Sequence, residues 1–183
     1  MRIGKDFIGK PIYSLTDGKL LGEVKDIYLD KSLDGIMGVF VGKEGLFSRK
    51  ERLIKRESVH VFGLDAILVK NSEVVLDSSQ YAPASEWVRR ESIQNRDVDT
   101  PGGTKVGRLG DIIVDEDALV AGFILAKVFV EGPIAETQTV SRQAMLDTGD
   151  KDGAMTVDLQ RAEKPSLVSI VAEKEAEADE EQE

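Results

Sequence analysis

The sequence predicts an all-β protein built from two small β-barrels in tandem, followed by a disordered acidic tail. First, residues 22–30 (GEVKDIYLD) recur in modified form as residues 107–115 (GRLGDIIVD). Second, both halves consist of short apolar runs separated by clusters of Gly, Asp and Lys, with no long helical period between them. Third, residues 173–183 contain seven acidic residues and one basic residue.

The similarity between the two halves extends beyond these nine residues. Residues 38–41 match residues 122–125 in the same order, and the length differences between the copies fall at turn-forming residues. Insertions are tolerated at turns because the chain there runs over the surface. We therefore interpret the pattern as a duplication and predict that Asp26 and Asp111 occupy equivalent places.

The strands of the first copy follow from its apolar pattern. Residues 11–15 predict a strand, residues 16–19 a hairpin turn and residues 21–30 a second strand. The alternation of that second strand slips between Val24 and Ile27, which predicts a bulge or bend near Lys25 and Asp26 of the kind that curls a small sheet. Further strands are predicted over residues 36–41, 51–54, 58–62, 66–70 and 73–76.

The first copy resembles the PRC-barrel domain. The resemblance rests on an apolar strand, an Asp-Gly turn, the run Leu-Gly-Glu-Val-Lys-Asp-Ile-Tyr-Leu-Asp, an apolar strand with Gly and a closing Gly-Leu-Asp-Ala-Ile-Leu-Val. It covers residues 7–76, and residues 91–159 less completely because the second copy lacks the closing Gly-Leu-Asp. This family is named from the H subunit of the photosynthetic reaction centre and also forms the C-terminal half of a ribosome-maturation factor. The resemblance implies small all-β barrels that bind other proteins, and it carries over no catalytic residue.

The domain boundaries are predicted from composition. We expect a first PRC-barrel-like domain over residues 1–77, a linker over 78–90, a second, diverged domain over 91–172 and a disordered tail over 173–183. The linker region is small and polar, and the like charges of the tail resist packing. Trp87 is the only tryptophan, and we expect it to fill the seam between the domains rather than to contact a partner.

Composition limits the function further. The 183 residues include no cysteine, which excludes disulfides and thiolate metal sites. The N-terminus lacks the apolar core of a signal peptide, and the longest apolar run, residues 119–126, is too short to cross a bilayer, so we expect a cytoplasmic protein without a transmembrane segment. The net charge of −10 also argues against direct nucleic-acid binding.

No catalytic, cofactor or metal site is predicted. His60 is the only histidine and alternates with Val59 and Val61, which predicts an exposed strand residue. The three carboxylates at residues 115–117 lack the spacing of a calcium loop and are typical of a solvated turn. Residues 101–105 lack the spacing of a phosphate loop and match the hairpin turn of the first copy.

The best candidate for a binding surface is the loop over residues 42–52, with four basic and two acidic residues. An apolar pair in a loop beside basic residues suits a protein-binding surface. The alternative is that Leu46 and Phe47 fold back over the barrel mouth, and the sequence favours neither reading. The predicted protein-binding residues are Leu46, Phe47, Arg49, Lys50 and Arg52.

We therefore expect a non-catalytic adaptor or scaffold that binds another protein or a larger assembly through barrel surfaces. One alternative is an accessory factor in ribosome or RNA assembly, by analogy with the maturation factor. A second is a subunit or accessory protein of a membrane-associated complex, photosynthetic or of cell division. An enzyme is disfavoured because the sequence shows no nucleophile–base pair and no metal constellation.

Overall fold

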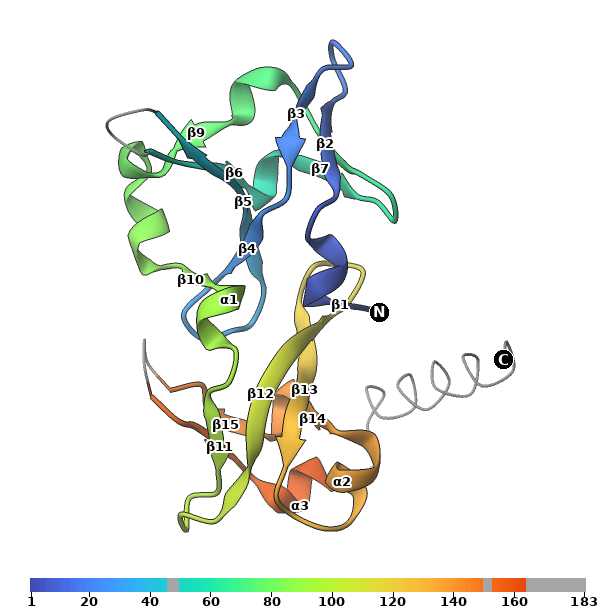
Figure 1. Cartoon of the computed structure of the whole chain (residues 1–183), viewed down its shortest axis with the longest axis vertical. Helices are drawn as coiled ribbons and strands as arrows, with labels where there is room; N and C mark the ends of the chain where they lie inside the picture. Colours follow the sequence, from blue (N-terminus) through green and yellow to red (C-terminus); the bar gives the residue numbers. More distant parts are fainter. Residues whose placement is uncertain (46–49, 150–152, 164–183) are drawn as a thin grey trace, which may run out of the picture. The chain divides into compact units, whose positions relative to one another are not determined.

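A computed structural model describes residues 1–45, 50–149 and 153–163 of the chain (Figure 1). The fold is mostly β, with a few short helices. The chain divides into two compact units. The N-terminal unit comprises Gly4–Asp30 and Ile36–Glu91, and the C-terminal unit comprises Met1–Ile3, Lys31–Gly35 and the chain from Ser92 onward. Within the described residues, no helix combines the length and apolar character needed to span a membrane.

The N-terminal unit contains two sheets, with strand orders β10-β4-β5-β6-β9 and β3-β2-β8-β7. Its elements are η1 (Gly4–Phe7), β2 (Pro11–Ser14), β3 (Leu20–Glu23), β4 (Asp26–Leu29), β5 (Ile36–Glu44), β6 (Lys50–Lys55), η2 (Arg56–Ser58), β7 (Val59–Phe62), β8 (Ile67–Val69), η3 (Ser72–Val74), β9 (Leu76–Asp77), η4 (Ser78–Gln80), η5 (Ala82–Glu86) and β10 (Val88–Arg89). The helix α1 (Arg90–Ile93) spans the division between the units.

The C-terminal unit contains one sheet with the order β14-β13-β12-β11-β16-β15, and β1 pairs with β12. Its elements are β1 (Arg2–Ile3), β11 (Asp97–Asp99), β12 (Lys105–Val114), β13 (Val120–Val128), α2 (Pro133–Thr137), β14 (Thr139–Ser141), η6 (Arg142–Ala144), β15 (Met145–Asp147), β16 (Met155–Val157) and α3 (Leu159–Ala162).

The bend predicted near Lys25 and Asp26 is confirmed. β3 ends at Glu23 and β4 begins at Asp26, so the predicted single strand is divided. At the division the Val24 N–H donates to the Lys10 carbonyl at 2.9 Å, and the Lys25 N–H donates to the Phe40 carbonyl at 2.8 Å. The chain thereby passes from one sheet to the other without leaving these backbone groups unpaired. In the C-terminal unit the corresponding β12 is a single strand with register shifts at the same place.

Asp26 and Asp111 hold equivalent positions within their own units, as the repeat predicts. Asp26 of β4 pairs with Phe40 of β5, and Asp111 of β12 pairs with Ile124 of β13. Both aspartates are buried, and each accepts a hydrogen bond from the backbone N–H of the next residue, at 2.9 and 2.7 Å. The two strand pairs therefore share their register as well as their order.

The hydrogen-bonded strand order does not close into a ring in the described part of either unit. In the N-terminal unit, the bend after β3 separates two open sheets. Both sheets contribute fully buried side chains, among them Ile12 and Ile67 from one sheet and Ile27 and Ile54 from the other. Burial of these side chains stabilises the curled arrangement through removal of apolar surface from water.

Residues 73–76, predicted as a strand, form most of the turn η3 and the first residue of β9. The side chain of Asn71 accepts a hydrogen bond from the Glu73 N–H at 3.0 Å, which offers the backbone an alternative to strand pairing. The strand prediction for this segment is therefore wrong for residues 73–75.

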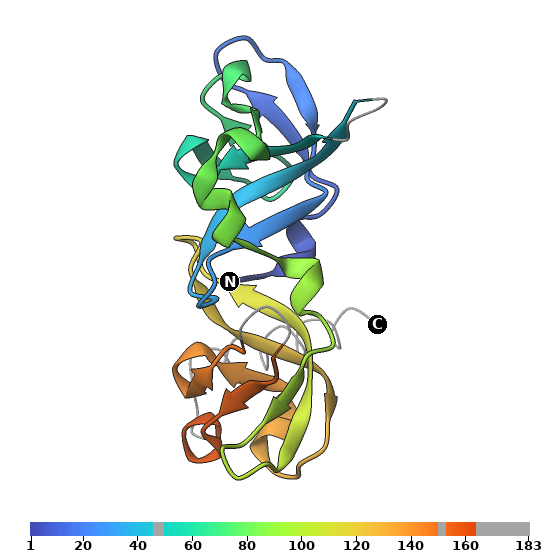
Figure 2. The same cartoon turned by 90° about the vertical axis from the view of Figure 1, so that its left-hand side faces the viewer.

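The segment 78–90, predicted as a linker, is folded within the N-terminal unit as η4, η5 and β10 (Figure 2). Val88 of β10 pairs with Leu29 of β4, and the Asp77 carboxylate caps η4 by accepting from the Ser79 N–H. Side-chain capping and strand pairing satisfy backbone groups that a linker exposes to water. The unit boundary consequently falls after Glu91, and residues 1–3 and 31–35 group with the C-terminal unit.

Candidate protein-binding site

The predicted binding loop connects β5 to β6. Three of its five predicted residues, Leu46, Phe47 and Arg49, lie outside the described residues. The other two, Lys50 and Arg52, lie on β6. The part of this site that can be described is therefore the hairpin stem, formed by β5 and β6.

The stem is longer than the sequence predicts because β5 continues to Glu44, which pairs with Lys50. Lys43 pairs with Glu51 one position earlier, and their side chains form an ion pair with Nζ 3.1 Å from Oε1. Across the strands, Arg52 Nη1 lies 3.2 Å from Glu44 Oε2. Opposite charges on facing strand positions stabilise the pairing of the strands by a few tenths of a kcal/mol.

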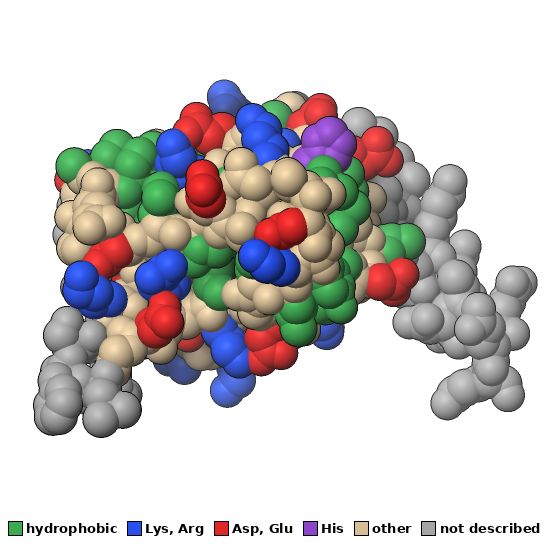
Figure 3. All heavy atoms as spheres, turned by 90° about the horizontal axis from the view of Figure 1, so that it is seen from above, with side chains coloured by type: hydrophobic (Ala, Val, Ile, Leu, Met, Phe, Trp, Pro, Cys, Tyr) green, Lys and Arg blue, Asp and Glu red, His purple; other side chains and the backbone are tan. Residues whose placement is uncertain are grey.

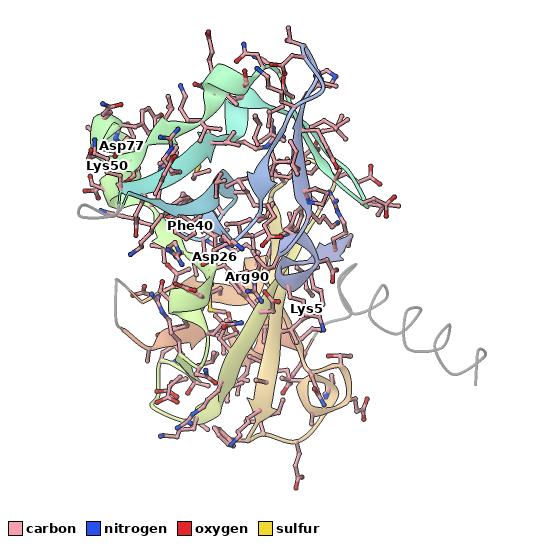
Figure 4. All side chains as sticks on the ribbon, turned by 45° about the horizontal axis from the view of Figure 1, so that its top comes forward. Lys5, Asp26, Phe40, Lys50, Asp77 and Arg90 are labelled. Atoms are coloured by element: carbon pink, nitrogen blue, oxygen red, sulfur yellow. The ribbon has the colours of Figure 1, made fainter. Side chains whose placement is uncertain are left out.

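Lys50 reaches a carboxylate outside the loop. Its Nζ lies 3.0 Å from Oδ2 of Asp77, the last residue of β9, and Figure 4 shows the two side chains together. The other oxygen, Oδ1, accepts hydrogen bonds from the Ser79 N–H at 3.0 Å and the Ser79 hydroxyl at 2.8 Å. The hydrogen bonds from Ser79, and then the Lys50 ammonium, lower the pKa of Asp77 from 3.8 to about 2.

These contacts reduce the positive charge that the loop over residues 42–52 presents to a partner. Lys43, Lys50 and Arg52 each lie within ion-pair distance of a carboxylate. The net positive charge counted over residues 42–52 is thus largely compensated by local partners, one of which lies outside that segment. Exposed ion pairs of this kind contribute little to stability, but they weaken the field that the stem presents to an acidic partner.

The unusual titration of Asp77 is testable. Ser79→Ala is expected to raise the pKa of Asp77 from about 2 toward its ordinary value, because the largest cause of the lowering is the hydrogen bond from Ser79. The folded-state pKa lies below the unfolded one, so the stability contributed by the Asp77 carboxylate is present above about pH 4 and is lost as the pH falls toward 2. Carboxyl-carbon NMR titration measures the shift.

The matched control for this titration is Ser85→Ala. The Ser85 hydroxyl donates to the Ala82 carbonyl, and Ser85 is not among the groups that shift the pKa of Asp77, so this variant is expected to leave the titration of Asp77 unchanged. An Asp77 pKa that is equal in both variants contradicts the role assigned to Ser79.

The stem is attached to the apolar core through Tyr28. The Tyr28 hydroxyl donates to Glu51 Oε2 at 3.4 Å, and the Tyr28 ring belongs to a buried cluster with Phe40 and Leu53. Burial, and then the charge of Glu51, raise the pKa of Tyr28 to about 12. The base of the hairpin is thus fixed by core packing, and two of the residues predicted to bind, Lys50 and Arg52, lie on its stem.

Trp87 lies in the N-terminal unit and packs against the same cluster. Its ring centroid is 5.7 Å from that of Tyr28 and 5.4 Å from that of Tyr81. Tilted aromatic pairs at such distances are favourable. The sequence identifies Trp87 as an interior residue but assigns it to a seam between domains. The structure shows its packing inside one unit, and the seam role stays a prediction.

A second polar cluster, centred on Asp26, is not anticipated from the sequence as a cluster. Asp26 Oδ2 accepts from Arg89 Nε at 3.0 Å and from the Glu91 N–H at 3.2 Å. The Arg89 guanidinium also lies 3.9 Å from the centroid of the Phe40 ring, a cation–π distance. The cluster fastens β10 to β4, and Asp26 is more than 60 residues from both Arg89 and Glu91 in sequence.

The structure also places the other residues weighed as candidates in the sequence. His60 is exposed on β7. The Asp115 carboxylate accepts from the N–H groups of Asp117 and Leu119, both at 2.9 Å, and so closes a turn. Residues 101–104 form the exposed turn between β11 and β12. In the portion of the chain that the structure describes, no group of three or more His, Cys, Asp or Glu residues is arranged to hold a metal ion.

Comparison with known proteins gives one positive finding. A search among curated proteins returned no match to this chain. A family model does match residues 2–76, and these residues contain β2 to β8 and most of the bent strand pattern described above. The first part of the chain is therefore a PRC-barrel domain.

Proposed function

We propose that this protein is a non-catalytic cytoplasmic adaptor that binds another protein or a larger assembly through surfaces of its PRC-barrel domain. The observation that supports this proposal most directly is the β5–β6 hairpin. Its base is tied into the core by Tyr28, and its charged stem residues are paired with one another or with Asp77. Between the two strands the sequence has the apolar pair Leu46 and Phe47 beside Arg49. This combination suits a protein-binding anchor.

We further propose that the C-terminal unit is a second, diverged PRC barrel, followed by an acidic tail over residues 173–183. Three features support a tandem arrangement. Its strand order β14-β13-β12-β11-β16-β15 corresponds to β6-β5-β4 and β3-β2-β8-β7 when β12 is matched to β3 and β4 together. The register shifts of β12 fall at the place that corresponds to the bend between β3 and β4, and the pairing of the two aspartates also agrees. The acidic tail lies outside the described residues.

Affinity capture tests the adaptor proposal. The full chain, immobilised and exposed to lysate of its own source, is expected to retain a reproducible protein partner identified by mass spectrometry. The double substitution Leu46→Ser and Phe47→Ser is expected to reduce recovery of that partner about tenfold or more, as truncation of an apolar anchor does.

The control is Phe129→Ser, which removes a half-exposed aromatic side chain from the C-terminal unit. This variant is expected to retain the partner at the level of the unmodified chain. Equal recovery by the loop variant and the unmodified chain contradicts the assignment to Leu46 and Phe47. Recovery of ribosomal proteins alone favours the accessory factor in ribosome assembly instead.

A further inference from the structure

The β3-β2-β8-β7 sheet of the N-terminal unit carries a continuous row of apolar side chains on one face. Leu20 of β3 pairs with Tyr13 of β2, Tyr13 pairs with Leu68 of β8, and Leu68 pairs with Val61 of β7. Leu20, Tyr13 and Val61 are 60%, 38% and 41% exposed, and Leu68 is partly exposed. We call these four residues the apolar row. Hydrophobic side chains gather beside His60, the single histidine, in the space-filling view (Figure 3).

The row points away from the core. Ile12 and Ser14, the neighbours of Tyr13 along β2, are both buried, as are Ile67 and Val69 on either side of Leu68. Successive side chains of a strand point to opposite faces, so the core is filled by these neighbours. Burial within the unit therefore does not explain why four adjacent strands each present an apolar side chain on the other face.

The C-terminal unit provides an internal comparison at the same register. Asp99 pairs with Lys105 as Tyr13 pairs with Leu20, after the same irregularity of one residue. Asp99 also pairs with Thr156, and Thr156 pairs with Asp147. The four positions that hold the apolar row in the first unit are held here by these polar and charged residues. The backbone arrangement consequently does not require apolar residues at these positions.

We propose that the apolar row is a self-association surface that binds the same face of a second copy of this chain. Leu20, Leu68 and Val61 have wholly apolar side chains. Tyr13 alone among the four carries a polar group, its hydroxyl. A two-fold axis in the plane between two such faces sets apolar residues against apolar residues, which is the requirement of an isologous interface. Two sheets that pack in this way lie about 10 Å apart.

The size of the face fits a weak dimer. Four strands spaced by about 4.8 Å, each with about four residues at about 3.3 Å per residue, outline a face on the order of 250 Å² per copy. The two copies together therefore bury on the order of 500 Å², well below the roughly 1,200–2,000 Å² of a stable interface, so we expect a weak and transient dimer.

The distribution of charge also permits self-association at this face. Residues 1–76 hold 13 basic and 11 acidic residues, so the acidic excess of the chain lies elsewhere. Beside Leu20, Lys19 Nζ lies 3.1 Å from Asp17 Oδ2, so both signs are present at the end of the β2–β3 hairpin. Two such faces approach without the repulsion that a net charge of −10, spread evenly, imposes.

Sedimentation velocity of the full chain between about 1 and 500 µM tests the proposal. The unmodified chain is expected to change from monomer to dimer across this range. The double substitution Tyr13→Asp and Leu20→Lys copies the residues that the C-terminal unit holds at the same positions, Asp99 and Lys105. It is expected to weaken association at least thirtyfold while leaving the far-UV circular dichroism unchanged.

Val61→Glu, at the other end of the row, is a second and independent variant with the same expected loss. Phe129→Asp serves as the control, because it changes an exposed aromatic residue of the C-terminal unit and is expected to leave association unchanged. A chain that sediments as a monomer at every concentration overturns the proposal. So does a folded Val61→Glu or double variant that associates as the unmodified chain does, or an equal loss in Phe129→Asp.

Discussion

Replacing Asp26 by alanine is expected to lower the free energy of unfolding of the N-terminal unit by about 3 kcal/mol, the low end for a broken buried ion pair. The Asp26 carboxylate is buried and accepts hydrogen bonds from the Ile27 N–H, the Arg89 Nε and the Glu91 N–H. Without it, the largely buried Arg89 guanidinium loses this carboxylate, and the two N–H groups lose their acceptor. The value is the low end because the Arg89 side chain keeps some exposure to water, which screens the loss.

Urea unfolding followed by the fluorescence of Trp87 measures this loss, because Trp87 is the only tryptophan and lies in the same unit. Glu91→Ala is the matched control. It removes the exposed carboxylate that pairs with the same arginine and keeps the Glu91 N–H, so its expected cost is about 0–1 kcal/mol. Asp26→Asn, which keeps one acceptor oxygen, is expected to fall between the two. An alanine variant no less stable than Glu91→Ala contradicts the role assigned to Asp26.

The sequence correctly predicts those parts of the fold that short stretches of neighbouring residues determine. The slip in alternation between Val24 and Ile27 predicts the bend correctly because apolar side chains must face the core on both sides of it. The repeat likewise predicts the equivalent places of Asp26 and Asp111, since two copies of one pattern adopt one register. The first inference needs only neighbouring residues and the strand period, and the second needs only the comparison of one local pattern with another.

The structure of residues 78–90 depends on contacts that no local pattern specifies. Val88 pairs with Leu29, which lies far away in sequence, and the small polar residues before Trp87 are equally compatible with a linker and with short turns. Composition therefore predicts a boundary at residue 77, whereas the unit continues to Glu91. The tryptophan is the one local signal that this segment packs against something apolar.

The candidate surfaces show the same limit. Counting charges over residues 42–52 does not reveal that Lys50 is paired with Asp77, 27 positions further along the chain. The alternation around His60 predicts Val61 on the core side, but a register shift between Val59 and Val61 brings Val61 opposite Leu68 on the outer face. The apolar row is formed by one residue from each of four strands, so only the register reveals it.

Replacing Trp87 by alanine is expected to lower the free energy of unfolding by about 3 kcal/mol. Its ring packs on Tyr28 and Tyr81 and lies over Gly38, where an added Cβ atom comes within 3.0 Å of Trp87 Cζ3. Removal of a buried tryptophan ring costs about 3–5 kcal/mol, and the partial exposure of Trp87 places it at the lower end. Trp87→Phe keeps an aromatic ring and is expected to cost about 1 kcal/mol.

Because both substitutions remove the only tryptophan, urea unfolding is followed here by far-UV circular dichroism. A cost below about 1 kcal/mol for the alanine variant contradicts the packing described for this ring. Amide hydrogen exchange then distinguishes packing inside the N-terminal unit from a role at a seam. If Trp87 acts only within its unit, Trp87→Ala lowers protection in β4 and β5 and leaves β12 and β13 unchanged. Lowered protection in all four strands is the result expected if the ring also joins the two units.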